Sequence, residues 1–279
     1  MLTLTEKIAV ITGAGAGIGK GTAELYAELG ATTLIVDRDE ARANEAGAAL
    51  QRRGLRAHGF VADVTDPAQV TKIFDEIERR FGRLDILVNN VGGELGLQKP
   101  FLDTTDDECL KLYDANLRHA FLVTRAAIPL MRGGSTGGSI ITISTIEAFR
   151  GIPISTVYSA FKSAITGFTR SLALELAQEG IRVNAIAPET TDSAPAERSL
   201  RVMPEHLDRI RDWIPLGRFG RPRDIAGAAA FLASDFASWI TGTTIHVDGG
   251  ALAAGGWVRT PNGHWTHRPL VTGSGYRHH

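Results

Sequence analysis

The chain alternates between short, uninterrupted apolar runs and longer segments whose apolar residues recur every three or four positions. Apolar runs rich in valine and isoleucine are typical of strands that are buried on both faces of a parallel sheet, and the longer repeat is typical of amphipathic helices. Strands are therefore predicted at 7–12, 32–36, 57–62, 84–88, 139–143, 181–187 and 243–247.

Helices are predicted between most of these strands, at 20–29, 41–53, 67–81, 106–132 and 222–233, with a further helix that contains Tyr158 and Lys162. Strands that alternate with helices through short connections predict an α/β fold with a doubly wound parallel sheet of the Rossmann type. No linker divides the chain, so we expect a single catalytic domain over 1–251, with a lid at about 189–215 and a C-terminal extension at 252–279.

Composition narrows the classes of partner. Lys and Arg number 30 against 31 Asp and Glu, which leaves a formal charge of -1 and no field for nucleic acid or an anionic membrane. Cys109 is the only cysteine, so no intramolecular disulfide forms. The first residues lack the features of a signal peptide, and no apolar run approaches the ~20 residues of a membrane span. We expect a cytoplasmic protein that acts on a small molecule.

A glycine-rich turn joins the first predicted strand to the first helix. Its spacing, Gly-x-x-x-Gly-x-Gly, departs from the Gly-x-Gly-x-x-Gly fingerprint of dinucleotide sites. Glycines in this position still let backbone N–H groups approach a pyrophosphate at the positive end of a helix. The turn is therefore predicted to bind a dinucleotide through Gly13, Gly17, Ile18 and Gly19.

Asp37 stands at the end of the second predicted strand. A carboxylate there accepts hydrogen bonds from both ribose hydroxyls of an adenosine and repels a 2′-phosphate. The neighbouring Arg38 offers a cation to such a phosphate, but Ala16 occupies the place in the glycine turn where a second basic residue would help. The sequence favours NAD over NADP.

Two further strands end in polar residues, Asp63 after the third and Asn89–Gly92 after the fourth. In a doubly wound sheet the ligand lies beyond the carboxyl ends of the strands. These residues, the glycine turn and Asp37 are therefore expected to share one rim of the sheet and to line one site.

Tyr158 and Lys162 lie four residues apart, so a helix places them on one face. A cation beside a phenol favours the phenolate and makes the tyrosine a general acid or base. Ser144 and Thr145 follow the fifth strand, and a hydroxyl there can hold a substrate oxygen against the phenol. Asn116, a poor helix former inside the helix at 106–132, carries an amide that needs partners.

These motifs, in their order along residues 5–251, resemble the short-chain dehydrogenase/reductase family. The resemblance rests on Thr12 with the glycine turn, Asp63, Asn89-Asn90-Val91-Gly92, Asn116, Ser144-Thr145, Tyr158-x-x-x-Lys162, Asn184-Ala-Ile-Ala-Pro188 and Asp248-Gly249-Gly250.

The resemblance implies how the cofactor is held. The glycine turn would bind its pyrophosphate and Asp37 its adenosine ribose. The other contacts that the family implies involve Asp63 and Val64 at the adenine, Asn90, Gly92 and Pro188 along the cofactor, Lys162 at the nicotinamide ribose and Thr191 at the carboxamide.

It also implies the chemistry. Tyr158 would donate or accept the hydroxyl proton, Lys162 would lower its pKa, and Asn116 would hold a water in a proton relay. No metal is needed. The activity implied is hydride transfer between NAD(H) and a secondary alcohol or ketone by a homotetramer.

The sequence departs from the family pattern in three places. The catalytic hydroxyl of the family usually belongs to a serine thirteen residues before the tyrosine, where this chain has Thr145, so Thr145 is favoured over Ser144. Glu189 replaces the usual glycine after Pro188. The chain continues for 29 residues past Gly250, where many relatives stop within a few.

The substrate stays open among several classes. Residues 89–93 and 187–195 look most like those of dehydrogenases that act on cis-dihydrodiols of aromatic compounds. The alternatives are a reductase of 3-oxoacyl thioesters, sugars or steroids, and a regulator that binds NAD without catalysis. An acyl-carrier partner would favour a basic patch near the lid, and this region carries Arg198, Arg201, Arg209 and Arg211. In the extension, Trp257 and Trp265 are expected to pack on the body or on a neighbouring subunit.

Overall fold

The computed structural model describes residues 1–133, 137–192, 204–256, 258, 259, 265 and 266, and no side chain of 204–207, 259, 265 or 266. Within these ranges seven parallel strands form one sheet in the order β3-β2-β1-β4-β5-β6-β7. The predicted doubly wound sheet is therefore confirmed. The strands are β1 (Ile8–Thr12), β2 (Thr32–Asp37), β3 (Ala57–Val61), β4 (Ile86–Asn89), β5 (Gly138–Ile143), β6 (Ile181–Pro188) and β7 (Thr244–Val247).

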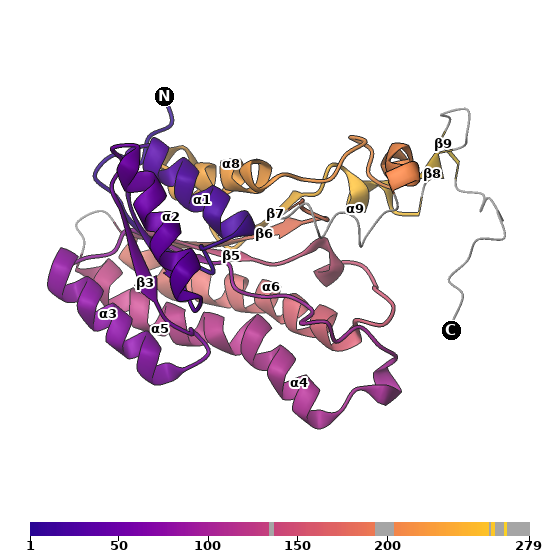
Figure 1. Cartoon of the computed structure of the whole chain (residues 1–279), viewed down its shortest axis with the longest axis horizontal. Coiled ribbons are helices and arrows are strands. Elements are labelled where there is room, and N and C mark those ends of the chain that lie inside the picture. The colour runs from indigo at the N-terminus through magenta and orange to yellow at the C-terminus, as the bar shows by residue number, and fades with distance from the viewer. Residues whose placement is uncertain (134–136, 193–203, 257, 260–264, 267–279) are drawn as a thin grey trace.

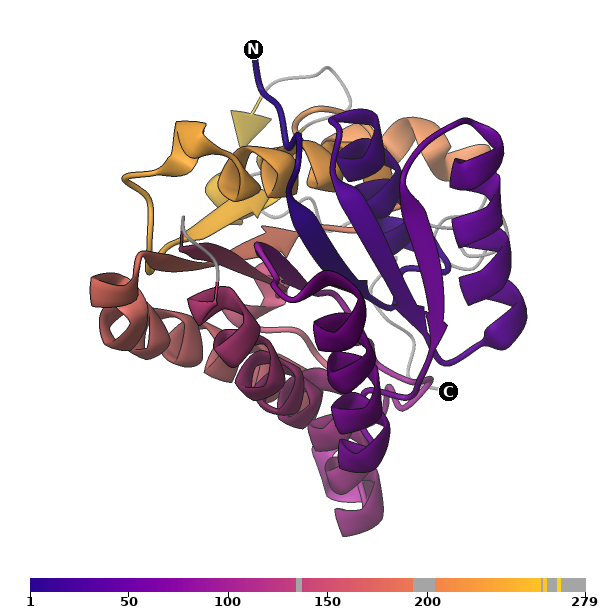
Figure 2. The same cartoon turned by 90° about the vertical axis from the view of Figure 1, so that its left-hand side faces the viewer.

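Helices cover both faces of the sheet (Figures 1 and 2). One layer holds α1, α2 and α8, and the other holds α3, α5 and α6. The helices of the described chain are α1 (Gly17–Glu28), α2 (Glu40–Arg52), α3 (Pro67–Phe81), α4 (Asp106–Tyr113), α5 (His119–Arg132), α6 (Thr156–Leu176), α8 (Pro222–Ala233) and the short α9 (Ala251–Ala254).

Successive side chains along the central strands point to opposite faces of the sheet and so contribute to the two apolar cores, one on each face. In β1, Ala9 and Ile11 pack with α1, α2 and α8, whereas Val10 packs with α3, α5 and α6. Tyr26 of α1 is fully buried, and its hydroxyl donates to the carbonyl of Ala229 in α8 at 2.9 Å. A buried phenol needs such a partner, and this bond ties the first helix to the last long one.

Most predicted boundaries agree with the structure to within one to three residues. The helices at 67–81 and 222–233 have the predicted bounds, since Asp66 and Arg221 precede a proline in the first helical position. The prediction of one regular helix over 106–132 was wrong in its middle, because a π-helical turn, η2 (Asp114–Arg118), separates α4 from α5.

The predicted lid and the C-terminal extension are described only in part. Residues 204–212 form a 3₁₀ helix, η5 (Pro204–Asp212), and Ile210 and Ile214 pack into a small apolar cluster with Ile146, Phe219 and Ala251. In the extension, β8 (Val258–Arg259) pairs antiparallel with β9 (Trp265–Thr266). Trp257, the side chain of Trp265 and residues 193–203 lie outside what is described, so the predictions made for them stay untested. No helix in the described ranges is long and apolar enough to cross a membrane.

Candidate active site

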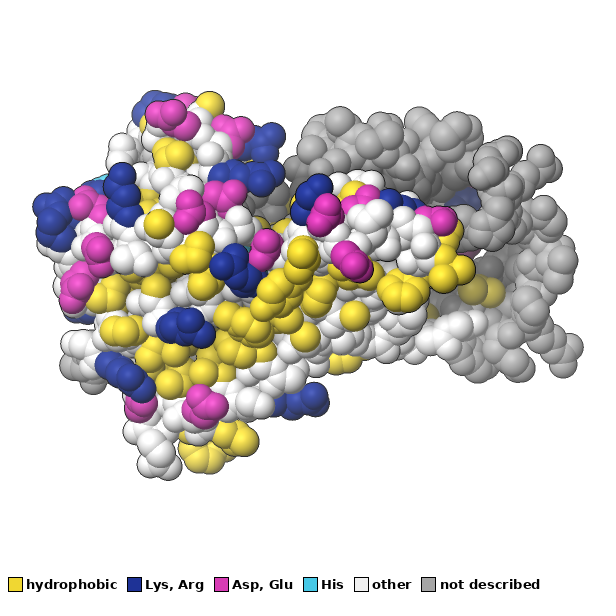
Figure 3. All heavy atoms as spheres, turned by 90° about the horizontal axis from the view of Figure 1, so that it is seen from below, with side chains coloured by type: hydrophobic (Ala, Val, Ile, Leu, Met, Phe, Trp, Pro, Cys, Tyr) yellow, Lys and Arg dark blue, Asp and Glu magenta, His cyan; other side chains and the backbone are white. Residues whose placement is uncertain are grey.

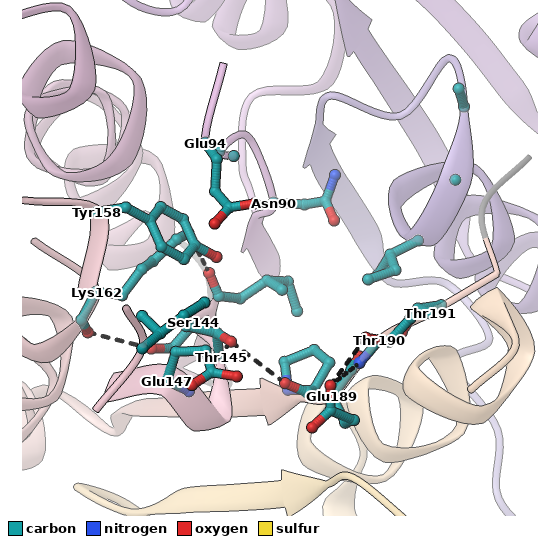
Figure 4. A pocket seen from close by; sticks show the side chains of 18 of the residues that line it. Asn90, Glu94, Ser144, Thr145, Glu147, Tyr158, Lys162, Glu189, Thr190 and Thr191 are labelled. Atoms are coloured by element: carbon teal, nitrogen blue, oxygen red, sulfur yellow. Dashed lines mark hydrogen bonds between the residues drawn. The ribbon is translucent and has the colours of Figure 1, made fainter. Parts of the chain in front are cut away.

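A cavity of about 500 Å³ opens at the carboxyl ends of the strands, where the order of the sheet reverses between β1 and β4. The glycine turn, the ends of β4, β5 and β6, and the first turns of α6 all contribute to its wall (Figure 4). A second cavity of about 280 Å³ lies at the ends of β2 and β3 and shares Arg42, Asn90 and Gly92 with the first. Together they form the groove that a doubly wound sheet offers to a dinucleotide.

Close backbone packing shapes the glycine turn. Gly13 and Gly17 have φ values of 61° and 55°, which are strained for other residues. A Cβ added to Gly19 would lie 2.4 Å from the carbonyl oxygen of Gly13 and 2.6 Å from Nδ2 of Asn90. That amide nitrogen donates to the carbonyls of Thr12 and Gly13, at 3.0 and 3.1 Å. Asn90 therefore locks the turn from β4.

The turn leaves the start of α1 open to the cavity. Ala16 precedes the helix without a side-chain cap, and the first turn carries no acidic residue. Ala16, Gly17 and Ile18 all line the larger cavity. Uncapped N–H groups at the positive end of a helix suit an anion, so the residues fit the pyrophosphate of a dinucleotide.

Asp37 faces the smaller cavity in the company of two arginines. Its Oδ2 accepts a hydrogen bond from the backbone N–H of Gly15 at 2.9 Å, and its Oδ1 accepts one from Asp39 at 3.0 Å. Arg38 and Arg42 line the same cavity. Sequence reasoning missed Arg42, because only the packing of α2 against Gly15 brings it to the groove.

Asp63 and Val64 form the far wall of the smaller cavity. Oδ1 of Asp63 accepts hydrogen bonds from the backbone N–H and the hydroxyl of Thr65, at 2.9 and 2.7 Å. Val64 is buried beside them. The apolar side chain of Val64, next to the carboxylate of Asp63 that orders this loop, can therefore pack against a flat base such as adenine.

Tyr158 and Lys162 occupy the first two turns of α6, as predicted, and both side chains line the larger cavity. The hydroxyl of Tyr158 faces the cavity, and the ammonium of Lys162 lies 5.9 Å from the centre of the Tyr158 ring (Figure 4). The Nζ of Lys162 donates to the carbonyl of Ile143 at 3.1 Å. A Cβ on Gly92 would lie 2.6 Å from this nitrogen, so the glycine leaves room for the cation.

Burial lowers the pKa of Lys162 to about 8. The folded protein therefore binds fewer protons than the unfolded chain between pH 8 and the ordinary lysine value near 10.5. Stability should rise with pH across this window, by on the order of 3 kcal/mol from this residue.

The variant Lys162→Met removes the titrating group and is expected to lose this rise. The check is the difference in unfolding free energy between wild type and variant, from urea titrations at pH 7 to 10.5 without cofactor. Exposed lysines cancel in the difference. A difference that does not change with pH would contradict the assigned burial of the charge.

Asn116 lies in the π-helical turn η2 and is buried. Its Nδ2 donates to the carbonyls of Leu112 and Gly93, at 3.0 and 2.9 Å, and its Oδ1 accepts from the N–H of Gly93 at 2.9 Å. The amide thus fixes the chain that follows β4. Its predicted role of holding a water in a relay stays a prediction.

His119, three residues after Asn116, was not predicted from the sequence as a residue near the site. It is buried, and its Nδ1 has no hydrogen-bond partner in the described part of the chain. Burial and the nearby charge of Lys162 lower the pKa of His119 to about 3, so the ring is neutral near pH 7.

The two hydroxyls after β5 point in different directions. Ser144 is buried, and its Oγ donates to the carbonyl of Lys162 at 3.1 Å, which fixes α6 against the strand. Thr145 is half-buried, and its Oγ1 accepts from the N–H of Glu147 at 3.3 Å and makes a long contact of 3.5 Å to the carbonyl of Pro188. Thr145 is therefore the freer hydroxyl at the cavity.

The loop after β6 carries Glu189 into the cavity wall. One oxygen of Glu189 accepts from the N–H and the hydroxyl of Thr190, and the other pairs with Arg150 at 2.7 Å. Arg150 also pairs with Glu147 at 2.7 Å. Where the family usually has a glycine, this chain thus carries a carboxylate that an arginine holds. Thr191, two residues further on, lines the cavity and forms an isolated parallel β-bridge with Gly220.

The chain is similar to proteins of one family over most of its length. Residues 13–251 match the family model described as enoyl-(acyl carrier protein) reductase. A hexahydro-indene-carboxyl-CoA reductase of Mycobacterium tuberculosis is 38% identical over 246 residues, which cover 88% of this chain and 92% of the relative. A galactitol 2-dehydrogenase of Agrobacterium fabrum is 36% identical and aligns over 89% of this chain and 98% of its own.

The fold is also similar to that of solved dehydrogenase structures. A candidate NAD(P)-dependent gluconate 5-dehydrogenase from Beutenbergia cavernae, with NADP bound at low occupancy, superposes with a TM-score of 0.82. It is 35% identical, and the match covers 90% of this chain and 99% of that one.

Proposed function

Because the chain belongs to the short-chain dehydrogenase/reductase family of oxidoreductases, we propose that it transfers a hydride between NAD(H) and a secondary alcohol or ketone. The observation that carries this proposal is the cavity at the glycine turn, which has the Tyr158 hydroxyl and Thr145 on its wall and the Lys162 ammonium behind them. A phenol, a hydroxyl and a cation at one cavity can hold and protonate a single substrate oxygen.

Each residue has a role that its contacts support. Bound NAD supplies a hydride acceptor, or as NADH a hydride donor, at the nicotinamide. Tyr158 takes the hydroxyl proton of the alcohol or returns it to the carbonyl oxygen, and Thr145 donates a hydrogen bond to that oxygen. Lys162, held by the carbonyl of Ile143, favours the phenolate. Ser144 and Asn116 position α6 and the chain after β4.

The choice of NAD rests on Asp37. Its carboxylate stands at the ribose end of the groove, where it accepts from a 2′-hydroxyl and repels a 2′-phosphate. Arg38 and Arg42 oppose this choice, because guanidinium groups bind phosphate. The hydrogen bond from the backbone N–H of Gly15 holds the carboxylate of Asp37 in place at this cavity, which supports NAD.

Cofactor reduction across a panel of secondary alcohols and cis-diols tests the proposal. We expect turnover with at least one member, and kcat/KM for NAD at least about 10-fold above that for NADP, since one unfavourable charge contact costs roughly 1.4 kcal/mol or more. The same panel run with NADP and with heat-inactivated protein supplies the controls.

Two outcomes would contradict parts of the proposal. A preference for NADP would overturn the role of Asp37 and point to Arg38 and Arg42 as phosphate ligands. NAD binding without turnover of any alcohol, diol, sugar, steroid or 3-oxoacyl thioester would favour a regulator that binds the cofactor and lacks the chemistry.

Among substrates, we favour a cis-dihydrodiol or a related diol over a 3-oxoacyl thioester. An acyl-carrier partner would need free basic groups near the lid. Of the four arginines considered there, the two within the described ranges lie near carboxylates, Arg209 at 2.9 Å from Asp212 and Arg211 at 4.0 Å from Asp208. Arg198 and Arg201 lie outside those ranges.

We also propose a homotetramer. Apolar side chains gather on the face that α4 and α5 present to solvent (Figure 3). Leu110 is 60% exposed there, and the ring centres of Phe121 and Phe168 of α6 lie 4.7 Å apart with the rings tilted by 59° and only partly buried. An exposed apolar face of this kind supports a contact between subunits.

A further inference from the structure

Glu94 reaches the larger cavity from the loop after β4, opposite Thr145 and Glu189 (Figure 4). Its Oε1 accepts a hydrogen bond from the hydroxyl of Ser155 at 2.5 Å, and its Oε2 accepts one from Nε2 of Gln98 at 2.5 Å. Ser155 directly precedes α6, the helix of Tyr158. The carboxylate is therefore fixed beside the predicted proton donor.

The backbone around Glu94 has an unusual conformation. Leu95 has φ of 56°, which costs a non-glycine residue on the order of 1–3 kcal/mol, and Gly93 and Gly96 also have positive φ. The N–H of Leu97 donates to the carbonyl of Glu94 at 2.9 Å. Strain of this kind persists where surrounding contacts impose it, and it is concentrated at functional sites.

Glu94 has no ion pair with a basic side chain of the described residues. Glu147 and Glu189, the other two carboxylates of the cavity, share Arg150. The cations that line this cavity are Lys162, which is buried behind Tyr158, and Arg42, which lies toward the adenosine end. The part of the cavity in front of Tyr158 is therefore acidic.

We propose that Glu94 is a substrate anchor that accepts a hydrogen bond from a second hydroxyl group near the reacting carbon. The inference rests on the proposed function and narrows it, because the preferred substrates are then uncharged diols or polyols. Substrates that carry a carboxylate near the reacting carbon are rejected.

The chemistry of the carboxylate favours a hydroxyl donor. Each oxygen of Glu94 already accepts one hydrogen bond and keeps a lone pair for one more. A hydroxyl group needs a single acceptor, whereas an ammonium brings three N–H donors and finds only Glu94 unpaired at this end. An anionic group would lie against an uncompensated carboxylate in a half-enclosed site, where repulsion is weakly screened.

The test compares three substrates with NAD: cyclohexanol, the cis-diol of cyclohexane and a hydroxycyclohexanecarboxylate. For wild type we expect kcat/KM for the diol to be about 10-fold to 100-fold above that for the mono-alcohol, because one hydrogen bond to a charged group strengthens binding by about this factor. Glu94→Gln should lose most of this ratio, leave the mono-alcohol within about 3-fold, and improve the carboxylate.

Glu175→Gln, on the exposed side of α6, is the matched control and should change none of the three values. Melting temperature and NADH affinity of Glu94→Gln should equal those of wild type. A variant that loses all three substrates alike and melts earlier would assign Glu94 to holding α6, and the proposal would be wrong. A wild type that does not prefer the diol would also overturn it.

A binding measurement separates this inference from the proposed function. Calorimetry on the Tyr158→Phe variant with NADH measures the affinity for the diol without turnover. Affinity that exceeds that for the mono-alcohol and falls about 10-fold on adding Glu94→Gln supports the anchor even if no substrate is turned over. Equal affinities for diol and mono-alcohol would refute it while leaving hydride transfer intact.

Discussion

Replacing Tyr158 by phenylalanine is expected to abolish turnover, with kcat lower by about 100-fold to 10,000-fold. The phenol is the only proton donor that we assign at the substrate oxygen, whereas the ring itself packs beside the buried cation of Lys162, 5.9 Å from its centre. Phenylalanine keeps the ring and removes only the hydroxyl. Single-turnover and steady-state rates with the best diol of the panel provide the measurement.

The affinity for NAD serves as the internal control for this variant. It should stay within about 10-fold of wild type, because one lost hydrogen bond of neutral groups is worth roughly 0.5–1.5 kcal/mol. Near-normal turnover would move the chemistry away from Tyr158 and would sink the proposed mechanism. Loss of both turnover and NAD affinity would instead indicate a collapsed site, which a melting curve would reveal.

Gly19→Ala should weaken NAD binding by about 10-fold to 100-fold, the consequence of losing one or two well-placed contacts to a charged group. The new Cβ would lie 2.4 Å from the carbonyl oxygen of Gly13, far below any normal contact. The backbone of the turn must then shift, together with the N–H groups that we propose as ligands of the pyrophosphate. Overpacking of this kind also costs roughly 1–3 kcal/mol of stability. Calorimetric titration with NAD and urea unfolding give the two values.

Gly227→Ala in α8 is the matched control. A Cβ there meets nothing within 4 Å, and the position is an exposed helix interior. Alanine should therefore raise stability by about 0.5–1 kcal/mol and leave NAD affinity unchanged. If Gly19→Ala bound NAD like wild type, the turn would not be the pyrophosphate site.

The fold was predictable because its strands are short apolar runs that hold local information. Buried runs such as Ile8–Thr12 carry apolar residues on both faces, and that pattern marks a parallel strand covered on both sides. The sheet inferred from these runs is confirmed, and so is the family inferred from the motifs. The π-helical turn was not predictable, because residues 106–132 retain an ordinary helical pattern and the extra residue depends on contacts with Gly93.

The candidate site also has a part that local sequence patterns predict and a part that depends on contacts between distant segments. The predicted residues on the rim come together at one groove because they follow parallel strands, and Tyr158 and Lys162 line the same cavity. Among the groups missed at the sequence level, Arg42 and Glu94 reach the groove through loop and helix packing between distant parts of the chain, and Arg150 pairs with Glu189 on its wall. A single sequence holds no periodic signal for such contacts, since each depends on backbone conformations that other segments impose. The functional roles of all these residues stay predictions.

The π-helical turn at Asn116 also changes how α4, η2 and α5, which together form one continuous helical rod, present their apolar side chains. An extra residue advances the rod by about 100°, so the stripes on either side of the turn are out of phase. Downstream, α5 keeps its apolar stripe buried against the sheet, while upstream α4 buries Leu112 alone. Substitutions can therefore remodel the outer half of the rod and the loop before it without disturbing the half that supports the sheet.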